Sequence, residues 1–214
     1  MTGMRQQPEQ PHDSAWAHVQ GRSVFVDDRP PLPGELCCGL VLSPVAAGQI
    51  ESLDLAAVRG TPGVVAVFTA EDFRLNQWGT IFQDQPFLAA ERVNHVGEPV
   101  ALVAATDKWS LAQGIARAQV KVSKEKPILS LPDAIAAESF LGPLRHIRRG
   151  DAKKALASAP HQVSGRQLIA GQDHFYLESQ CAIAYPGEGH SVEIHASSQH
   201  PTEAQHWVAQ ALGF

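Results

Sequence analysis

The sequence GQDHFYLE at residues 171–178, followed by SSQHPTE at residues 197–203, frames the part of this chain whose secondary structure has the clearest pattern. Apolar and β-branched residues recur through residues 163–185, which predicts a long extended stretch. The sequence PGEG at residues 186–189 is typical of a tight turn, and the alternating run VEIHA at residues 192–196 predicts the returning strand. These residues are therefore predicted to form a β-hairpin.

A helix is predicted to begin at Pro201, inside the second quoted run. Its apolar residues repeat with the i, i+3, i+4, i+7, i+8 spacing of one buried face: Ala204, Trp207, Val208, Ala211 and Leu212. Gly213 is placed to cap its C-terminus. Because a hairpin and one helix are marginal by themselves, we expect residues after about 165 to be stable only against the remainder of their domain or another surface.

The first half of the chain alternates strands with short helices. Strands are predicted at Val24–Val26 and Leu36–Leu42, which flank a proline-rich turn, and at Val64–Thr69 and Val100–Ala105. A short helix at Asp54–Val58 ends at a glycine and proline turn before the third of these strands. The strand predicted at Val100–Ala105 is apolar throughout, so we expect it to be covered on both faces.

A second helix is predicted after that strand. Asp107 is placed to cap its N-terminus. Its apolar residues fall on one face: Leu111, Ile115 and Ala118. The alternating run VKVS at residues 120–123 is typical of a half-exposed strand. Strands and two amphipathic helices over residues 21–125 predict a small α+β domain.

Two further segments complete the division of the chain. Residues 1–20 are polar and lack apolar periodicity, so we predict a flexible leader. Residues 126–165 are predicted to be a linker in which Pro132 and Asp151 begin short helices. Residues 166–214 then hold the hairpin and the last helix.

Composition excludes several classes of protein. Hydrophobic residues make up 44% and charged residues 18% of the 214 residues, which is ordinary for a globular protein. The net charge is −5 and no basic surface is indicated, so we expect no nucleic-acid partner. No run approaches the roughly 20 apolar residues of a membrane span, and the N-terminus lacks a signal-peptide core. We therefore expect no membrane contact and a cytoplasmic location.

Titratable residues form no recognisable metal or nucleophile motif. The adjacent Cys37 and Cys38 suit neither a disulfide framework nor a zinc site, and we expect them to be buried thiols in a strand. Four histidines near the C-terminus lack the usual metal-site spacing: His190, His195, His200 and His206. In a strand, His174 and Glu178 would lie about 13 Å apart, too far for an acid–base pair. These residues are therefore not predicted to be catalytic.

Several runs together resemble the aldehyde oxidase and xanthine dehydrogenase family of molybdenum hydroxylases. GRSVFVDD at residues 21–28, TPGV at 61–64 and VGEPVA at 96–101 are similar to its a/b hammerhead domain. The two runs quoted first are similar to the opening of the molybdopterin-binding domain in the xanthine dehydrogenase branch. The resemblance implies an α+β chain with a hammerhead domain, a linker and an incomplete start of the cofactor domain.

Gln199 is the candidate cofactor-binding residue. The resemblance implies that its side-chain amide donates a hydrogen bond to an oxo ligand of the molybdenum. Without the resemblance, a glutamine that bonds to turn backbone is an equally good interpretation. His200 stands where the family has asparagine, and Asp173 where it has glutamate. The family's catalytic base and glycine-rich loop have no counterpart before Phe214, so no catalytic residue or metal ligand is assigned.

The resemblance also implies a function. The family's complete molybdenum subunit hydroxylates hypoxanthine and xanthine toward urate with water as the oxygen source. It uses molybdenum-molybdopterin, with 2Fe-2S clusters and FAD on a partner subunit or on further domains. The chain alone is expected to bind no cofactor and to be inactive, and its partners would be the remainder of the molybdenum subunit, the iron–sulfur/FAD subunit and the purine.

Two alternatives stay open, and the substrate class is also open. The chain could be a non-catalytic hammerhead remnant that acts as a structural or subunit-packing module. It could be an unrelated small α+β binding protein. Within the family, the residues that discriminate purine from aldehyde substrates are not among these 214.

Overall fold

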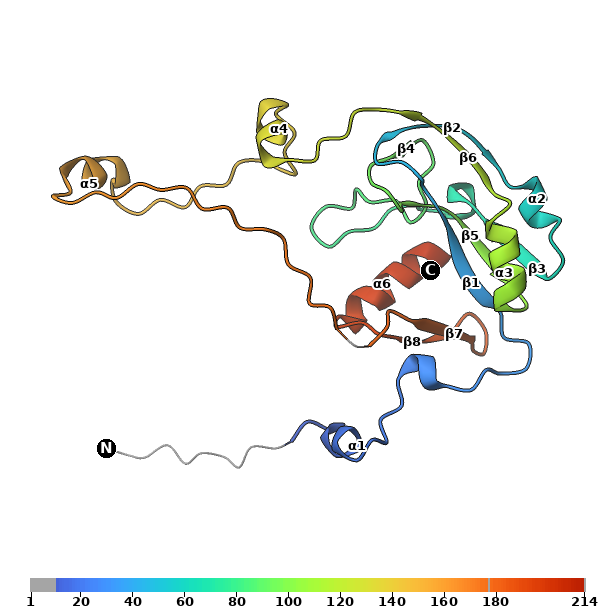
Figure 1. The fold of residues 1–214 in the computed structure, drawn as a ribbon. Coiled ribbons are helices and arrows are strands. Elements are labelled where there is room, and N and C mark those ends of the chain that lie inside the picture. The colour runs from blue at the N-terminus through green and yellow to red at the C-terminus, as the bar shows by residue number, and fades with distance from the viewer. Residues whose placement is uncertain (1–10, 177, 214) are drawn as a thin grey trace.

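Two antiparallel sheets form the body of the first half of the chain (Figure 1). In the computed structural model, which describes residues 11–176 and 178–213, each of these sheets has three strands. The first has the order β1 (Cys37–Leu42), β5 (Pro99–Ala105), β3 (Val64–Phe68). The second has the order β4 (Arg92–Val93), β2 (Gly48–Asp54), β6 (Gln119–Lys124). The predictions for residues 1–10, Leu177 and Phe214 lie outside the described residues.

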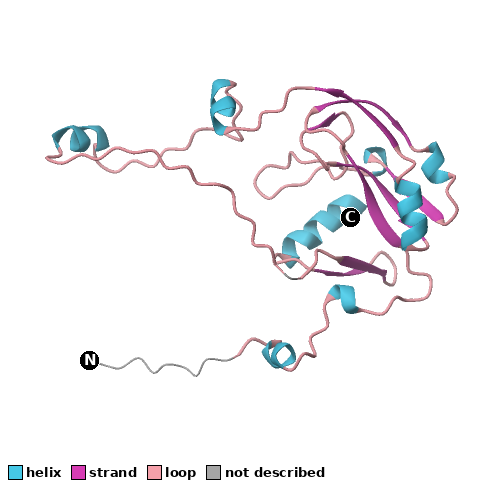
Figure 2. Cartoon of the chain, viewed as in Figure 1, coloured by secondary structure: helices cyan, strands magenta, loops and turns pink. Residues whose placement is uncertain are grey.

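The first half of the chain also contains short helices and turns (Figure 2). They are α1 (Ala15–Val19), the 3-10 turn η1 (Val26–Asp28), α2 (Ala56–Arg59), the 3-10 turn η2 (Ala70–Asp72) and α3 (Lys108–Ile115). Helix α3 packs on β1 and β5, and α2 packs on β3 and α3. Mixed strands and helices confirm the predicted α+β class.

The core lies around β5, the central strand of the first sheet. Val100, Val103 and Ala105 have no exposed surface, and β5 is buried along both faces as its continuous apolar sequence predicts. Val58 from α2 and Val93 from β4 complete the buried centre. The predicted face of α3 packs against it through Leu111 and Ile115.

Asp107 caps α3, as the sequence predicts. Its carboxylate accepts hydrogen bonds from the Ser110 backbone N–H at 2.8 Å and from the Ser110 hydroxyl at 2.7 Å. These bonds favour the ionised form and lower the pKa of Asp107 below its ordinary value of 3.8. Such a group stabilises the fold above its unfolded-state pKa, and the stabilisation is lost as the pH falls through the lowered folded-state pKa.

We expect Asp107→Asn to destabilise the chain at about pH 5 and to cost progressively less as the pH falls toward about 2. The asparagine keeps an oxygen acceptor at the helix terminus but cannot titrate. Urea midpoints across this range measure the difference. Asp84→Asn is the control: its side chain is exposed and makes no hydrogen bond within the described residues, so this variant should follow the unsubstituted chain. If the difference in urea midpoint between Asp107→Asn and the unsubstituted chain stays constant with pH, the ionised Asp107 carboxylate is not the source of the stabilisation.

Residues 126–176 form an arm that extends away from the body and returns toward the hairpin (Figures 1 and 2). It contains α4 (Leu131–Ala136), capped by Ser130, and α5 (Ala152–Ser158), capped by Asp151. Both helices lie where Pro132 and Asp151 predict them. Large apolar side chains along the arm are exposed, and some almost fully, including Leu141 at 98% and Ile147 at 102%. Such a surface is unusual for a segment that completes its packing by itself.

The predicted hairpin and final helix are confirmed. Strand β7 (Ala182–Pro186) pairs antiparallel with β8 (Val192–Ala196), and α6 (Pro201–Leu212) follows. The turn is closed by the Gly187 N–H, which donates to the Ser191 carbonyl at 2.8 Å. Gly213 adopts φ +83° and caps α6, a left-handed conformation that glycine accommodates without steric cost.

Four sequence predictions are wrong in detail. Val24–Val26 is not a strand, because Val26–Asp28 closes a 3-10 turn in which the Phe25 N–H donates to the Asp28 carboxylate. Residues 163–176 and 178–181 form no strand, since no other strand lies beside them in the described chain. The thiols are not buried: Cys38 is exposed, and Cys37 is half-buried in β1. A short helix at Ala15–Val19 lies within the predicted leader.

Candidate functional site

The loop between β8 and α6 holds the candidate residue, and its neighbours are fixed by hydrogen bonds. The Ser197 N–H donates to the Cys181 carbonyl, and the Cys181 N–H donates to the Ser197 hydroxyl, both at 3.0 Å. The His200 N–H donates to the Ser198 hydroxyl at 3.1 Å. On the N-terminal side of Gln199 the loop is therefore tied to Cys181, next to β7, and on the C-terminal side His200 is tied to Ser198 within the loop.

His200 caps helix α6. Its Nδ1 accepts a hydrogen bond from the Glu203 N–H at 3.2 Å, and Pro201 follows as the first helical residue. An asparagine side chain would accept the same bond through its oxygen. The departure from the family pattern at this position therefore preserves the capping role.

The Gln199 side chain is exposed, and no hydrogen bond to it is found in the described residues. The interpretation of a glutamine that bonds to turn backbone therefore has no support here. The backbone N–H groups of Ser197, His200 and Glu203 are used in hydrogen bonds within this region. The Gln199 amide remains as a free neutral donor at the junction of strand and helix. Its N–H group can donate a hydrogen bond to an oxygen ligand of a bound group. Among residues 11–176 and 178–213, no cluster of three or more side chains could hold a metal ion.

A groove of about 620 Å³ runs between the hairpin and α6. Its apolar lining comes from β8 and from one side of α6, through Val192, Ile194, Pro201, Ala204 and Val208. Val192 and Ile194 are each more than one-third exposed. This groove has the size of a small-molecule site.

Helix α6 also touches the first half of the chain. The Trp207 ring meets the Trp78 ring edge-on, with centroids 5.0 Å apart. The Gln210 side chain donates to the Gln77 carbonyl, and the Arg74 guanidinium donates to the Gly213 carbonyl at 3.4 Å. The C-terminal end of α6 is thus held against the loop before β4.

The other titratable residues singled out by the sequence are not brought together. His174 and Glu178 are both exposed and make no ion pair with each other. Partial desolvation and the neighbouring Asp27 carboxylate raise the pKa of the Cys181 thiol. Partial desolvation and the adjacent Cys37 likewise raise the pKa of Cys38. Both thiols therefore stay protonated at neutral pH and are poor nucleophiles.

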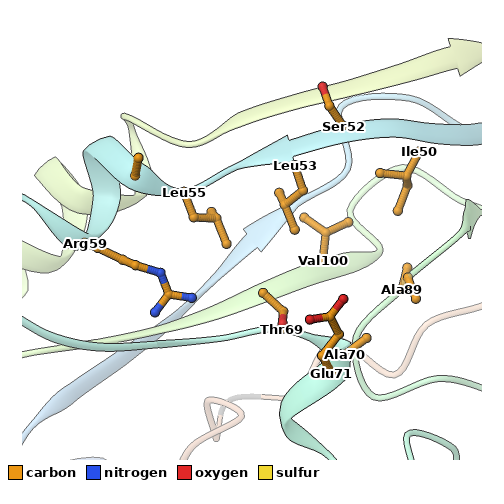
Figure 3. A pocket seen from close by; sticks show the side chains of 12 residues that line it. Ile50, Ser52, Leu53, Leu55, Arg59, Thr69, Ala70, Glu71, Ala89 and Val100 are labelled. Carbon is orange, nitrogen blue, oxygen red and sulfur yellow. The ribbon is translucent and has the colours of Figure 1, made fainter.

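A second pocket, of about 580 Å³, lies between β2, β5 and η2 (Figure 3). Leu53, Leu55 and Val100 give it an apolar wall, and the side chains of Arg59 and Glu71 lie at the opposite side (Figure 3). Arg59 Nη1 donates to the Val67 carbonyl at 2.9 Å. The lining includes neither histidine nor cysteine, so it provides no thiolate or imidazole for metal or nucleophilic chemistry.

Two sequence profiles match the chain. Residues 20–126 match the a/b hammerhead domain of aldehyde oxidase and xanthine dehydrogenase. Residues 133–214 match the molybdopterin cofactor-binding domain. The architecture is thus a hammerhead domain followed by the start of a molybdopterin-binding domain.

Curated relatives agree with these profiles. Xanthine dehydrogenase of Emericella nidulans is 35% identical over 207 residues, and xanthine dehydrogenase/oxidase of Rattus norvegicus is 38% identical over 206 residues. Each match covers 95% of this chain but 15% of the relative. The chain therefore spans about one-seventh of the length of these proteins.

Solved structures show the same fold. The aldehyde oxidoreductase from Desulfovibrio gigas superposes with a TM-score of 0.81 over 95% of this chain and 25% of its own, at 24% identity. Quinoline 2-oxidoreductase from Pseudomonas putida 86 superposes with a TM-score of 0.78 over 94% of this chain and 28% of its own, at 21% identity. The chain belongs to the aldehyde oxidase and xanthine dehydrogenase family of molybdenum oxidoreductases.

Proposed function

We propose that this chain provides the hammerhead domain and the opening of the cofactor-binding domain of a molybdenum hydroxylase that converts hypoxanthine and xanthine toward urate. The main support for this proposal is that the chain is 35–38% identical to xanthine dehydrogenases across 95% of its length. The division follows the predicted boundaries: leader 1–20, hammerhead 21–125, linker 126–165 and cofactor-domain start 166–214. The chain works in the cytoplasm and is not catalytically competent by itself.

Gln199 is the residue through which the chain meets the cofactor. Its amide N–H donates to an oxygen of the molybdenum-molybdopterin group, which supplies the redox chemistry when it is bound. Support comes from the free, exposed amide and from the anchored residues on either side of it. A neutral donor binds an oxygen without adding charge beside the metal. The chain's contribution is therefore orientation and hydrogen bonding.

The remaining parts come from elsewhere in the assembly. The rest of the molybdenum subunit provides the base and the substrate pocket, and a partner subunit or further domains carry 2Fe-2S clusters and FAD. The exposed apolar residues of the arm and the open groove beside α6 are the surfaces that these parts would cover. No helix within residues 11–176 and 178–213 has the length and apolar character needed to cross a bilayer.

We expect Gln199→Ala to lower the turnover of the assembled enzyme about 10- to 100-fold, the usual cost of losing a hydrogen bond to a metal-bound ligand. Xanthine-dependent reduction of an electron acceptor measures the rate. Gln113→Ala, on the exposed side of α3, is the matched control and should stay within about twofold. Equal rates for the two variants would contradict the role of Gln199 and would favour the rival proposal of a non-catalytic packing module.

A further inference from the structure

The segment that contains η1 lies against the hairpin, although 152 and 166 residues separate the partners. Asp27 and Arg29 provide the contacts, and both residues fall in the part of the chain that matches the hammerhead profile. The hairpin falls in the part that matches the cofactor-binding profile. Two charged side chains therefore connect the two domains at one place.

Asp27 contacts the start of the hairpin. Its carboxylate accepts a hydrogen bond from the Ser179 hydroxyl at 3.0 Å, and after desolvation it is the next cause that raises the pKa of the nearby Cys181 thiol. Cys181 in turn exchanges backbone and hydroxyl hydrogen bonds with Ser197. Through Cys181, Asp27 is therefore connected to Ser197, which lies two residues before Gln199.

Arg29 contacts the opposite strand. Its Nη2 lies 3.1 Å from His195 Nδ1, and His195 Nε2 lies 2.7 Å from the Glu193 carboxylate. Because a guanidinium can only donate, Nδ1 is the acceptor, and the ring hydrogen on Nε2 is donated to Glu193. The His195 ring also meets the Tyr185 ring edge-on, with centroids 5.7 Å apart. Arg29 and Glu193 therefore set the tautomer and the orientation of a ring four residues before Gln199.

We propose that Asp27 and Arg29 are positioning residues that hold the 197–200 loop, and with it the Gln199 amide, in place for the cofactor. The hammerhead domain then contributes directly to the geometry of the cofactor site. The inference rests on the proposed role of Gln199 for its functional consequence, but its structural part does not depend on that role.

Hydrogen–deuterium exchange of this chain within the assembled enzyme tests the structural part. Arg29→Ala and Asp27→Ala should each speed exchange of the backbone amides at residues 197–200 by about tenfold, the effect of losing one charge-assisted hydrogen bond. His195→Gln should restore slower exchange than His195→Ala, because its amide can both accept from Arg29 and donate to Glu193. Arg92→Ala, which breaks an exposed ion pair with Glu125 at 2.7 Å, is the control and should leave this loop unchanged.

Turnover of the assembled enzyme tests the functional part. Arg29→Ala should lower kcat more than it raises KM, because a displaced Gln199 affects the cofactor rather than substrate binding. Unchanged exchange at residues 197–200 in both alanine variants would overturn the inference. If the Asp27 and Arg29 variants speed exchange but Gln199→Ala does not lower turnover, the inference that these residues position the loop stands. The proposed role of Gln199 is then contradicted instead.

Discussion

Replacing Gly48 by alanine is expected to lower the free energy of unfolding by about 3 kcal/mol or more. Gly48 begins β2, the central strand of the second sheet, and pairs with Val93 and Lys124. A Cβ at this position would lie 1.9 Å from the Ser123 carbonyl oxygen. That oxygen belongs to the backbone of β6, so it cannot move away without breaking the pairing of β2 with β6. Urea unfolding followed by circular dichroism measures the loss.

Alanine variants at two other glycines serve as controls. They distinguish the cost of the steric clash at Gly48 from the cost of the backbone conformation. Gly97 has φ +82° but open space around its Cβ position, so Gly97→Ala should cost about 1–2 kcal/mol for the left-handed conformation alone. Gly60 has φ −82°, and the nearest atom to its Cβ position is 3.5 Å away, so Gly60→Ala should be close to neutral. A loss in Gly48→Ala no greater than that in Gly97→Ala would contradict the close approach of β2 and β6.

The second large effect is expected at Val103, which has no exposed surface at the centre of β5. Val103→Asp places a carboxylate among apolar side chains, with neither a cation nor water to compensate it. We expect a loss of about 4 kcal/mol or more, enough to unfold the first half of the chain. Near-ultraviolet circular dichroism and the urea midpoint report the loss.

Val65→Asp is the matched control for Val103→Asp. Val65 lies on β3 in the same sheet but is 57% exposed, so its aspartate would remain in water. We expect a change within about 1 kcal/mol. Similar losses in the two variants would mean that β5 does not form the centre of the core.

Elements with local signals were predictable from the sequence. Strand β5 is a continuous apolar run, and α3 has both a capping aspartate and an apolar face. The hairpin and α6 have turn residues, a proline at the helix start and a glycine at its end. In each case, a few adjacent residues determine the conformation.

Elements that depend on distant partners were not predictable in the same way. Strand β2 has the mostly polar sequence GQIESLD, and its pairing with β4 and β6 provides the order that its own side chains do not. The run at Val24–Val26 has strand-forming residues, but Asp28 folds it into a turn. Residues 163–176 have strand propensity and no partner strand in the described chain.

The candidate site shows the same division. Gln199 was identified through a family resemblance carried by local motifs, and the structure adds that its amide is free and its neighbours anchored. The contacts of Asp27 and Arg29 with the hairpin left no signal in the sequence, because they join residues more than 150 positions apart. His195 lacked metal-site spacing, and the structure places it between Arg29 and Glu193.

Molybdenum bound per polypeptide tests the central claim most directly. Elemental analysis would compare the purified chain alone with the same chain assembled with polypeptide equivalent to the remaining length of its xanthine dehydrogenase relatives. We predict no stoichiometric molybdenum in the chain alone, and about one atom per complex with xanthine oxidation in the assembly. An assembled, folded complex without molybdenum would contradict the proposal that this chain forms part of a molybdenum hydroxylase.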